Sequence, residues 1–477
     1  MDMIWKTAWL NVWRNKVRSL VVIVSVSIGI FGGVFAVAVM NGAIEQRVDA
    51  ALNDEIAHIH VNDPAFRDNY DIKLLVPHPQ QVLGTVRETP GVESLTSRIL
   101  LTGMANTAAK SAGVQILGID PPEEKEVLQL YKTTIPGTGD FFGEDSRHYL
   151  AYIGHELAKE LNIVRFQIDQ EVLDSLAAKG VPGEVLKKLS PFSGQRFKSE
   201  KSFKKEVKAV LSIKEQHAFG AVIRGEAWTF RARSKMTLTF LDREGMQTGA
   251  VFRIAGIYDI KNSMYEMSQV LVKKEDLAEL TGIGRNDYHQ LIIRLDDLES
   301  TEEVSATLRA HLPGLEVLNW KELQPDLAMM TEMVQKFYAI FMVIILAALA
   351  FGIVNTMLMV VLERTKELGM LTAIGMNKKR VFNMIMLESV FLSLVGGVAG
   401  MIISQIVIGA TARKGINFAS YAEGLEAMGY PAHIYPAIST SFFITVTILI
   451  ILTGVLSSIY PALKALKLDP AEALRTE

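Results

Sequence analysis

The sequence contains no cysteine in 477 residues, so any exported part of the chain must be held together by its core rather than by disulfide bonds. No G-x-x-x-x-G-K-[ST] phosphate-binding loop occurs, which excludes ATP binding through that motif. The stretch HELAKE that begins at His155 lacks the second histidine of the H-E-x-x-H zinc motif. We therefore expect no enzyme activity, no catalytic or metal-binding residues and no directly bound cofactor.

Charge is also missing from four long stretches. Residues 20–44, 337–362 and 437–463 are uncharged, and residues 381–412 contain only Glu388. Each stretch exceeds the roughly 20 residues that a helix needs to cross a bilayer. The sequence therefore predicts an α+β membrane protein with four transmembrane helices and a large polar block between the first two.

Short flanking segments set the expected orientation, because Lys and Arg accumulate in short cytoplasmic loops. The cations that favour one orientation are Lys6, Arg14, Lys16, Arg18, Arg364, Lys366, Lys378, Lys379, Arg380, Lys464, Lys467 and Arg475, whereas Arg413 and Lys414 count slightly against it. We expect the first group in the cytoplasm and the polar block in the periplasm, with the spans in a bacterial inner membrane. An Ala-x-Ala at 36–38 resembles a signal-peptidase site, but the long apolar run favours an uncleaved anchor.

These patterns divide the chain into nine predicted segments. They are a cytoplasmic interfacial helix at 1–18, a first span at 19–44, a periplasmic domain at 45–330, a stalk and second span at 331–362, a cytoplasmic coupling segment at 363–380, a third span at 381–412, a periplasmic loop at 413–437, a fourth span at 438–463 and a cytoplasmic tail at 464–477.

Tryptophan recurs every fourth residue before the first span, at Trp5, Trp9 and Trp13. At 100° per residue these side chains share one sector of a helix. Two arrangements fit this pattern: a helix lying on the inner membrane interface, or a plain extension of the first span with aromatic anchoring. Both place the segment at the membrane.

The exterior block is predicted to hold two subdomains and an insertion. Strand, helix and strand patterns follow one another at 55–103 and again at 289–320, so the two ends of the block should form one mixed α/β subdomain. Strand patterns at 235–242, 250–260 and 268–274 predict a mostly β second subdomain. Residues 165–233 are rich in Lys and Glu and have helical periodicity, which predicts a helical insertion.

Proline is absent between Pro325 and Pro431, and Pro325 itself suits the first turn of a helix. One helix could therefore run from residue 326 through the second span to residue 369, roughly 65 Å at 1.5 Å per residue. Such a rod would join the exterior block to the cytoplasmic loop.

Three smaller features have both an ordinary and a functional interpretation. His58 and His60 share one face of a strand, but no third metal ligand is evident, which favours ordinary strand residues. Glu388 is costly inside a span, although it could meet the cationic loop, and we expect a structural role before transport chemistry. The pairs with spacing for close helix packing are Gly29 with Gly33 and Gly396 with Gly400.

The loop between the second and third spans mixes charged and apolar residues at helical spacing. A helix of this kind either floats on the membrane or docks into a groove on another protein, with apolar anchors and charges that fix the register. The residues expected to couple to a cytoplasmic partner are Glu363, Arg364, Glu367, Leu368, Leu371, Ile374 and Gly375, and we expect Leu368, Leu371 and Ile374 to be exposed.

Several of these stretches resemble the FtsX-like ABC permeases, which include macrolide-exporter and lipoprotein-releasing permeases. ERTKELGMLTAIGMNKKRV at 363–381 is similar to the coupling segment of that family, and LESVFLSLVGGVAGMIIS at 387–404 is similar to its third span. WLNVWRNKVRSLVVIVSVSIGI at 9–30 resembles its lead-in and first span, and YPALKALKLDPAEALR at 460–475 resembles its C-terminal end.

The resemblance implies a permease that transmits movement from a separate cytoplasmic ABC ATPase dimer, the site of ATP binding, to the periplasm. It also implies a second permease copy or a related permease, and it leads us to expect a periplasmic or lipoprotein partner, with lipoproteins or other amphiphiles as substrates. The alternatives are an FtsX-type regulator of a cell-wall hydrolase and a sensor without an ATPase. Regulatory members have much smaller exterior domains, which favours transport. The 165–233 insertion departs from the family pattern and leaves the substrate open.

Overall fold

The computed structural model describes residues 2–143, 148–197, 199–231 and 233–466. The chain forms two compact units. The helical unit comprises residues 1–48, 326–422 and 430–477, and the α/β unit comprises residues 49–325 and 423–429. Most of the predicted cytoplasmic tail, including Lys467 and Arg475, lies outside the described residues.

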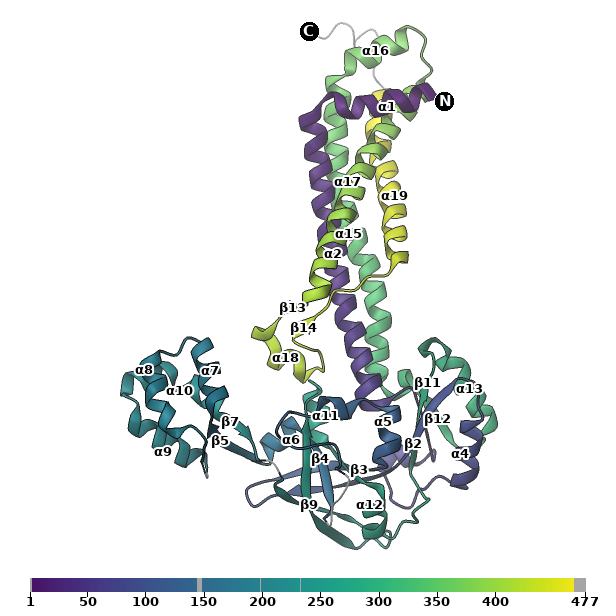
Figure 1. Cartoon of the computed structure of the whole chain (residues 1–477). Helices are drawn as coiled ribbons and strands as arrows, with labels where there is room; N and C mark the ends of the chain where they lie inside the picture. Colours follow the sequence, from purple (N-terminus) through teal and green to yellow (C-terminus); the bar gives the residue numbers. More distant parts are fainter. Residues whose placement is uncertain (1, 144–147, 198, 232, 467–477) are drawn as a thin grey trace. The chain divides into compact units, whose positions relative to one another are not determined.

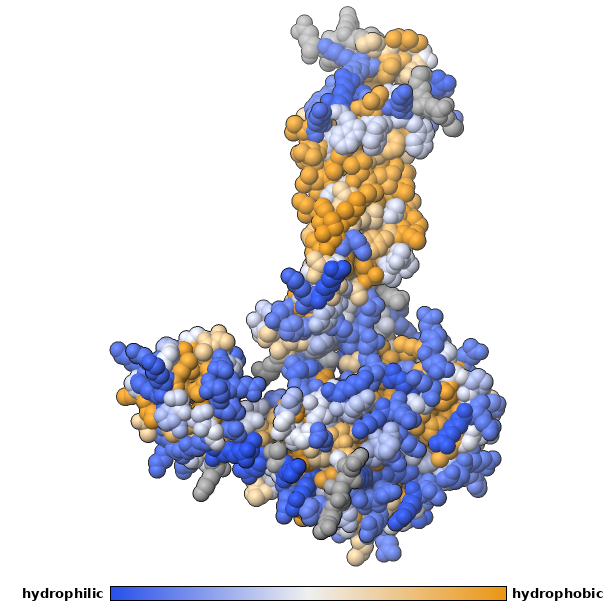
Figure 2. All heavy atoms as spheres, in the orientation of Figure 1, coloured by the Kyte–Doolittle hydropathy of each residue, from blue (hydrophilic) through white to orange (hydrophobic). Residues whose placement is uncertain are grey.

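Within the described residues, four helices are long and apolar enough to cross a membrane, as predicted. They are α2 (Lys16–Ala50), α15 (Pro325–Glu363), α17 (Lys378–Lys414) and α19 (Thr440–Leu466) (Figure 1). Hydrophobic side chains form a broad band along the middle of the helical unit (Figure 2), and the exposed ones include Leu20, Val24, Ile28, Phe337, Phe341, Ile344, Phe351, Ile402, Ile406, Ile444 and Ile448. An apolar surface of this extent is typical of contact with lipid.

A separate short helix precedes the first long helix. A single residue, Asn15, separates helix α1 (Asp2–Arg14) from α2. Helix α1 runs across the end of α2 rather than along it (Figure 1). The rings of Trp5 and Trp9 each lie 5.6 Å from the ring of Phe391 on α17, in edge-on contacts. Since the chain turns between α1 and α2, the structure disagrees with a plain extension of the first span.

The glycine pair of the third span permits a close approach between α17 and α2. A Cβ atom added to Gly396 would lie 2.8 Å from the Cβ of Val26, and one added to Gly400 would lie 2.7 Å from the carbonyl oxygen of Ser27. The Ser27 hydroxyl also donates a hydrogen bond to the Gly396 carbonyl at 2.9 Å. The prediction of close helix packing at this pair is confirmed.

Helix α15 is shorter than the predicted rod. It ends at Glu363, and after Arg364 a second helix, α16 (Thr365–Ala373), begins. The hydroxyl of Thr365 donates to the carbonyl of Leu362 at 2.7 Å, so a side chain satisfies a carbonyl of the last turn. The prediction of one continuous helix to residue 369 is therefore wrong by six residues.

In the α/β unit, the two ends of the segment pair as predicted. Strands β1 (Ile59–Asn62), β2 (Val92–Asn106), β11 (Gln290–Leu295) and β12 (Glu316–Asn319) form an antiparallel sheet in the order β12-β1-β11-β2. Helices α4 (Pro79–Arg87) and α13 (Thr301–His311) pack on it through a shared core. This is the mixed α/β subdomain expected from the repeated strand-helix-strand pattern.

The second subdomain is a closed ring of strands. The order β2-β3-β10-β4-β9-β8 returns to β2, because residues 103–106 of β2 also pair with β8. The further strands are β3 (Ser111–Ile119), β4 (Leu150–Gly154), β8 (Lys235–Leu241), β9 (Gln247–Tyr258) and β10 (Gln269–Lys273). Alternate residues of β8 are buried in the ring's core, which is the period-two pattern of a strand with one buried face.

The insertion folds around a core of its own. Helices α7 (Gln170–Ala178), α8 (Gly183–Leu189), α9 (Glu200–Val210) and α10 (Ile213–Ala227) surround this core. Asp169, Ser199 and Ser212 cap the N-termini of α7, α9 and α10 through their side chains. The insertion also contains a sheet that was not predicted, in the order β6-β5-β7, formed by β5 (Val164–Ile168), β6 (Gln195–Phe197) and β7 (Trp228–Phe230).

The remaining short elements connect these parts. They are α3 (Phe66–Asn69), α5 (Pro121–Val127), α6 (His155–Glu160), α11 (Ser263–Ser268), α12 (Lys274–Thr281), α14 (Trp320–Leu323), α18 (Ala422–Ala427), β13 (Ile416–Asn417) and β14 (His433–Ile434).

Candidate functional site

Helix α16 lies at the centre of the predicted coupling segment, and its two faces differ. Met370 is 51% exposed, and Ile374, the first residue after the helix, is 79% exposed. Leu368 is buried and Leu371 partly buried, both in the core shared with α15 and α17. The expectation that Leu368 is an exposed contact residue is wrong, because an isolated helix of nine residues is marginal and needs one face packed.

Gly375 forms the turn between α16 and α17. Its φ of +99° falls in a region that other residues rarely adopt. The amide of Gly375 donates to the Thr372 carbonyl at 3.1 Å, and the amide of Met376 donates to the Leu371 carbonyl at 3.0 Å. Gly375 therefore shapes the loop through its backbone.

Six charged side chains from α1, α2, α15, α16 and α17 and the residue that joins α15 to α16 meet in one place. We call them the elbow cluster: Arg14, Arg18, Glu363, Arg364, Glu367 and Glu388. The two guanidinium nitrogens of Arg14 bind the two carboxylate oxygens of Glu367, one at 2.9 Å. Arg18 pairs with Glu363. Two ion pairs therefore tie the N-terminal helices to the junction of α15 and α16.

Arg364 extends the elbow cluster into the third long helix. Its Nε lies 3.0 Å from an oxygen of Glu367, and its Nη1 lies 3.3 Å from an oxygen of Glu388. Glu388 is buried on α17, where an unpaired charge would be costly. Arg364 of the coupling segment compensates that charge. The structure thus places the predicted intramembrane acid beside the predicted coupling residues.

A small cavity of about 220 Å³ opens beside the elbow cluster. Its lining includes Asn11, Asn15, Ser19 and Thr356 in addition to all six members of the cluster. The hydrogen bond from Arg14 and the charge of Arg364 lower the pKa of Glu367 to about 2, against an opposing effect of burial. Glu367 is therefore ionised throughout the physiological range, and its pairs persist there.

The elbow cluster suits a mechanical role better than a chemical one. Three arginines face three carboxylates, and no cysteine or histidine lines the cavity among the described residues. Charge pairs that remain partly exposed gain little free energy, because water competes for both partners. Such pairs can separate and form again as the helices that carry them move.

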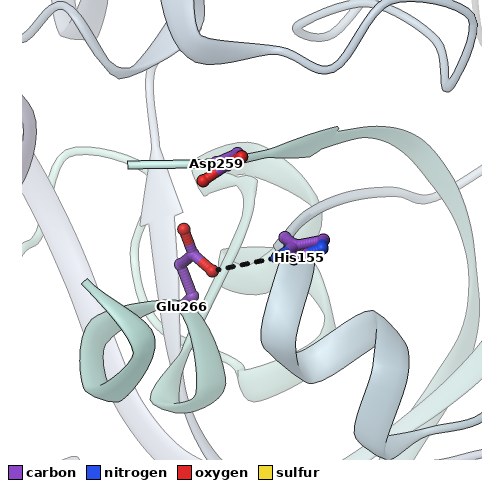
Figure 3. Close-up of side chains that lie close together, drawn as sticks. All are labelled: His155, Asp259 and Glu266. Atoms are coloured by element: carbon purple, nitrogen blue, oxygen red, sulfur yellow. Dashed lines mark ion pairs between the residues drawn. The ribbon is translucent and has the colours of Figure 1, made fainter. Parts of the chain in front are cut away.

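The α/β unit contains a second cluster, which could in principle hold a metal ion. Ligand atoms of His155, Asp259 and Glu266 lie within 4.8 Å of one another (Figure 3). One nitrogen and two carboxylates form a donor set that zinc accepts. Asp259 already pairs with Lys261, and Glu266 accepts the amide of Ile260 at 2.7 Å. A metal ion would have to displace the Lys261 ammonium group, so the group as it stands is an ion-paired cluster.

His58, which directly precedes β1, and His60, within β1, have structural roles. The Nδ1 of His58 accepts the amide of Leu295 at 2.9 Å, and the Nε2 of His60 contacts the carbonyl of Ile56 at 2.6 Å. Burial lowers the pKa of His58 to about 4 and that of His60 to about 3. Both side chains are thus neutral and engaged with the backbone, which agrees with their interpretation as ordinary strand residues.

Arg14 and Arg18 are the functional candidates that the sequence interpretation missed. They had been treated only as cations that set orientation. Their spacing of four residues equals that of Glu363 and Glu367, although in the structure each pair spans a break between two helices. Two complementary charge pairs with equal spacing are the one sequence signal that points to this contact.

Comparison with known proteins places four of the six members of the elbow cluster, all except Arg14 and Arg18, in a recognised domain. The family described as FtsX-like permease C-terminal matches residues 339–470, which include α16 and Glu388. An uncharacterized ABC transporter permease of Methanocaldococcus jannaschii, MJ1507, is 28% identical over 47% of this chain and 55% of its own length. The uncharacterized ABC transporter permease YknZ of Bacillus subtilis is 28% identical over 41% of this chain and 47% of its own length.

The macrolide export ATP-binding/permease protein MacB of Escherichia coli K12 is 25% identical over 47% of this chain and 34% of its own length. This chain therefore spans about half the length of the first two relatives and about a third of MacB.

Proposed function

The chain carries an FtsX-like permease domain and has homologues named ABC transporter permeases, and on that premise we propose that it is the permease subunit of an ABC transporter. A separate cytoplasmic ATPase dimer binds and hydrolyses ATP. Helix α16 receives the resulting movement, and the permease transmits it to the exterior domain of a bacterial inner-membrane complex.

The observation that carries this proposal is the exposed apolar surface at the end of α16. Met370 and Ile374 are four residues apart, so they lie on one face, and nothing among the described residues covers them. Lys378, Lys379 and Arg380 follow at once and are exposed. Apolar anchors with flanking charges are the features of a helix that docks into a groove on a partner.

The elbow cluster supports the transmission step. Glu367 of α16 pairs with Arg364, which in turn pairs with Glu388 of α17. Glu363, the last residue of α15, pairs with Arg18 of α2, so a displacement of the junction between α15 and α16 bears on three of the long helices at once. Because the pairs of Arg14 with Glu367 and of Arg18 with Glu363 are partly exposed, the cost of breaking them is small compared with the free energy of ATP hydrolysis.

A second permease, either another copy of this chain or a related chain, completes the complex. Met329, Met330 and Met333 are exposed in the first turns of α15, ahead of the apolar run that begins at Phe337. Methionine is flexible and polarisable, and it is common on surfaces that pack against a partner helix. The substrate is a lipoprotein or another amphiphile, which the exterior domain handles together with a periplasmic partner.

Copurification tests the docking step. Ile374→Asp places a charge in the proposed groove and should weaken ATPase binding by about 2–4 kcal/mol, which is the size of a hot-spot loss. Ile213→Asp, which changes a residue of similar exposure in the insertion, is the matched control. The ATPase should fall away from the first variant only. Equal recovery of the ATPase with both variants would contradict the docking model.

A further inference from the structure

The small sheet of the insertion has one apolar and one cationic face. Phe166 and Ile168 of β5 point into the core of the insertion, so Arg165 and Gln167 occupy the opposite face. The register of β7 on β5 places Thr229 opposite Arg165, and the register of β6 on β5 places Arg196 opposite Gln167. The second face of the sheet is therefore lined by polar side chains from all three strands.

Three arginines gather on this second face, and we call them the arginine face: Arg165, Arg196 and Arg231. Arg231 continues the pairing beyond β7, since its amide donates to the carbonyl of Ile163 at 3.2 Å. It is two residues from Thr229 and so lies on the same side of the sheet as Arg165. Burial and, after it, the charges of Arg196 and Arg231 lower the pKa of Arg165. Both neighbouring arginines therefore repel Arg165.

No carboxylate compensates this charge within the described part of the chain. None of the three arginine side chains makes an ion pair there, and the buried Nε of Arg165, a hydrogen-bond donor, has no partner. Asp169 lies on the same strand face, but it caps α7 by accepting the amide of Val172 at 2.9 Å. A buried donor without a partner is costly, and a bound anion would supply the missing acceptor.

We propose that the arginine face binds a phosphate-bearing ligand. Guanidinium groups form paired, charge-assisted hydrogen bonds with phosphate oxygens, and a terminal phosphate offers three acceptor oxygens to three arginines. A carboxylate offers only two oxygens and one negative charge. The site goes beyond the proposed transport function, because it lies in the insertion and requires neither ATPase docking nor the elbow cluster.

Two sources could supply this chemistry: free phosphate, or the phosphate headgroup of an amphiphile. Isothermal titration of the purified full chain in detergent distinguishes them with two probes, inorganic phosphate and dihexanoyl phosphatidic acid. Dihexanoyl phosphatidylcholine, whose phosphate carries a choline, controls for contacts made by the acyl chains alone. Tighter binding of phosphatidic acid than of inorganic phosphate identifies the headgroup, and equal binding identifies free phosphate.

The test variant carries Arg165→Gln, Arg196→Gln and Arg231→Gln. The matched control carries Lys187→Gln, Lys201→Gln and Lys214→Gln, which remove the same charge from exposed positions on α8, α9 and α10. The arginine variant should weaken phosphate binding at least a hundredfold, and the lysine variant should weaken it less than threefold.

Thermal unfolding of the same variants provides an independent readout. Because the arginines repel one another, the arginine variant should unfold at the same or a higher temperature than the wild type without phosphate, and it should gain nothing when phosphate is added. Absence of saturable phosphate binding to the wild type would overturn the proposal. Equal weakening by the lysine variant would also overturn it, since binding would then follow net charge alone.

Discussion

The two units of the protein each contain a cluster of charged side chains, and the clusters differ in their access to water. In the α/β unit, Arg98 and Glu124 are 3% and 2% exposed, and the Nε of Arg98 lies 3.3 Å from a Glu124 oxygen. In the elbow cluster, Arg14 and Glu367 are 60% and 37% exposed beside a cavity of about 220 Å³. The arginine–glutamate pair is thus buried in the α/β unit, where we call it sealed, and accessible to water in the elbow cluster, where we call it open.

This difference separates a structural pair from one that can move. Removing one partner of a sealed pair leaves an uncompensated buried charge, which costs several kcal/mol. Removing one partner of an open pair leaves a charge that water can solvate. We infer that the Arg98 pair fixes α5 on the sheet, whereas the exposed pairs of Arg14 and Arg18 in the elbow cluster can separate and form again in the transport cycle proposed above.

The largest expected effect comes from breaking the sealed pair. Glu124→Ala should destabilise the α/β unit by about 3–5 kcal/mol, because Arg98 would remain buried and unpaired. The neighbouring Glu123→Ala is the matched control, since Glu123 is more exposed and lies 3.9 Å from Arg87. Denaturant unfolding of the full chain measures both variants. A loss below 1 kcal/mol for Glu124→Ala would remove the distinction between the two clusters.

Burial in the same unit predicts a strong pH dependence. The pKa of His58 is lowered to about 4 by burial and by Arg294, while a histidine in the unfolded chain titrates near 6.5. As pH falls, the unfolded chain binds the proton first, so stability is lost between pH 6.5 and 4, by about 3 kcal/mol. His58→Asn keeps an acceptor for the Leu295 amide but does not titrate. Unfolding at pH 7 and pH 4.5 should show a smaller loss in this variant, and an unchanged loss would assign the effect elsewhere.

Much of the fold could be predicted because its signals are local. Uncharged runs gave the four long helices, and the repeated strand-helix-strand order gave the subdomain that joins β1 and β2 to β11 and β12. The sheet of the insertion escaped prediction because β6 and β7 are only three residues long, too short for alternation to be detected.

The candidate site was predicted only in part, because its contacts join distant segments. The acidic residues and Arg364 came from the coupling segment itself, but Arg14 is separated from Glu367 by 353 positions, and no local pattern links them. Leu368 on α16 was also expected to be exposed, whereas its side chain is buried. Helical spacing shows which residues share a face, and only the packing of α16 in the tertiary structure shows which face is buried.

The open cluster predicts a small effect on stability and a larger one on coupling. Arg18→Glu should change the free energy of unfolding by less than about 1 kcal/mol, because Glu363 is half exposed and stays solvated. Repulsion from Glu363 should nevertheless lower substrate-stimulated ATP hydrolysis in the reconstituted complex. The exchange of charges in Arg18→Glu with Glu363→Arg should restore that rate. If the double variant does not recover substrate-stimulated ATP hydrolysis, the pair of Arg18 with Glu363 is not needed for coupling.

The smallest effect concerns the acid titration of the elbow cluster. Glu367 has a pKa of about 2, below the value of about 4.5 expected in an unfolded chain, so its contribution to stability is present above pH 4.5 and is lost as pH falls toward 2. Exposure of the carboxylate limits this contribution to less than about 1 kcal/mol. Glu367→Gln should therefore leave the unfolding curves at pH 7 and pH 3 within 1 kcal/mol of the wild type. A larger change would show that this pair is sealed as well.

Site-specific crosslinking tests the central claim, that α16 docks onto the ATPase, most directly. Because the chain has no cysteine, a single Ile374→Cys or Met370→Cys substitution can carry a benzophenone maleimide without other labelled sites. Illumination of the assembled complex should crosslink the ATPase from both positions, whereas Ile213→Cys in the insertion should give no such product. Crosslinks to the ATPase from Ile213→Cys and none from Ile374→Cys or Met370→Cys would contradict the account.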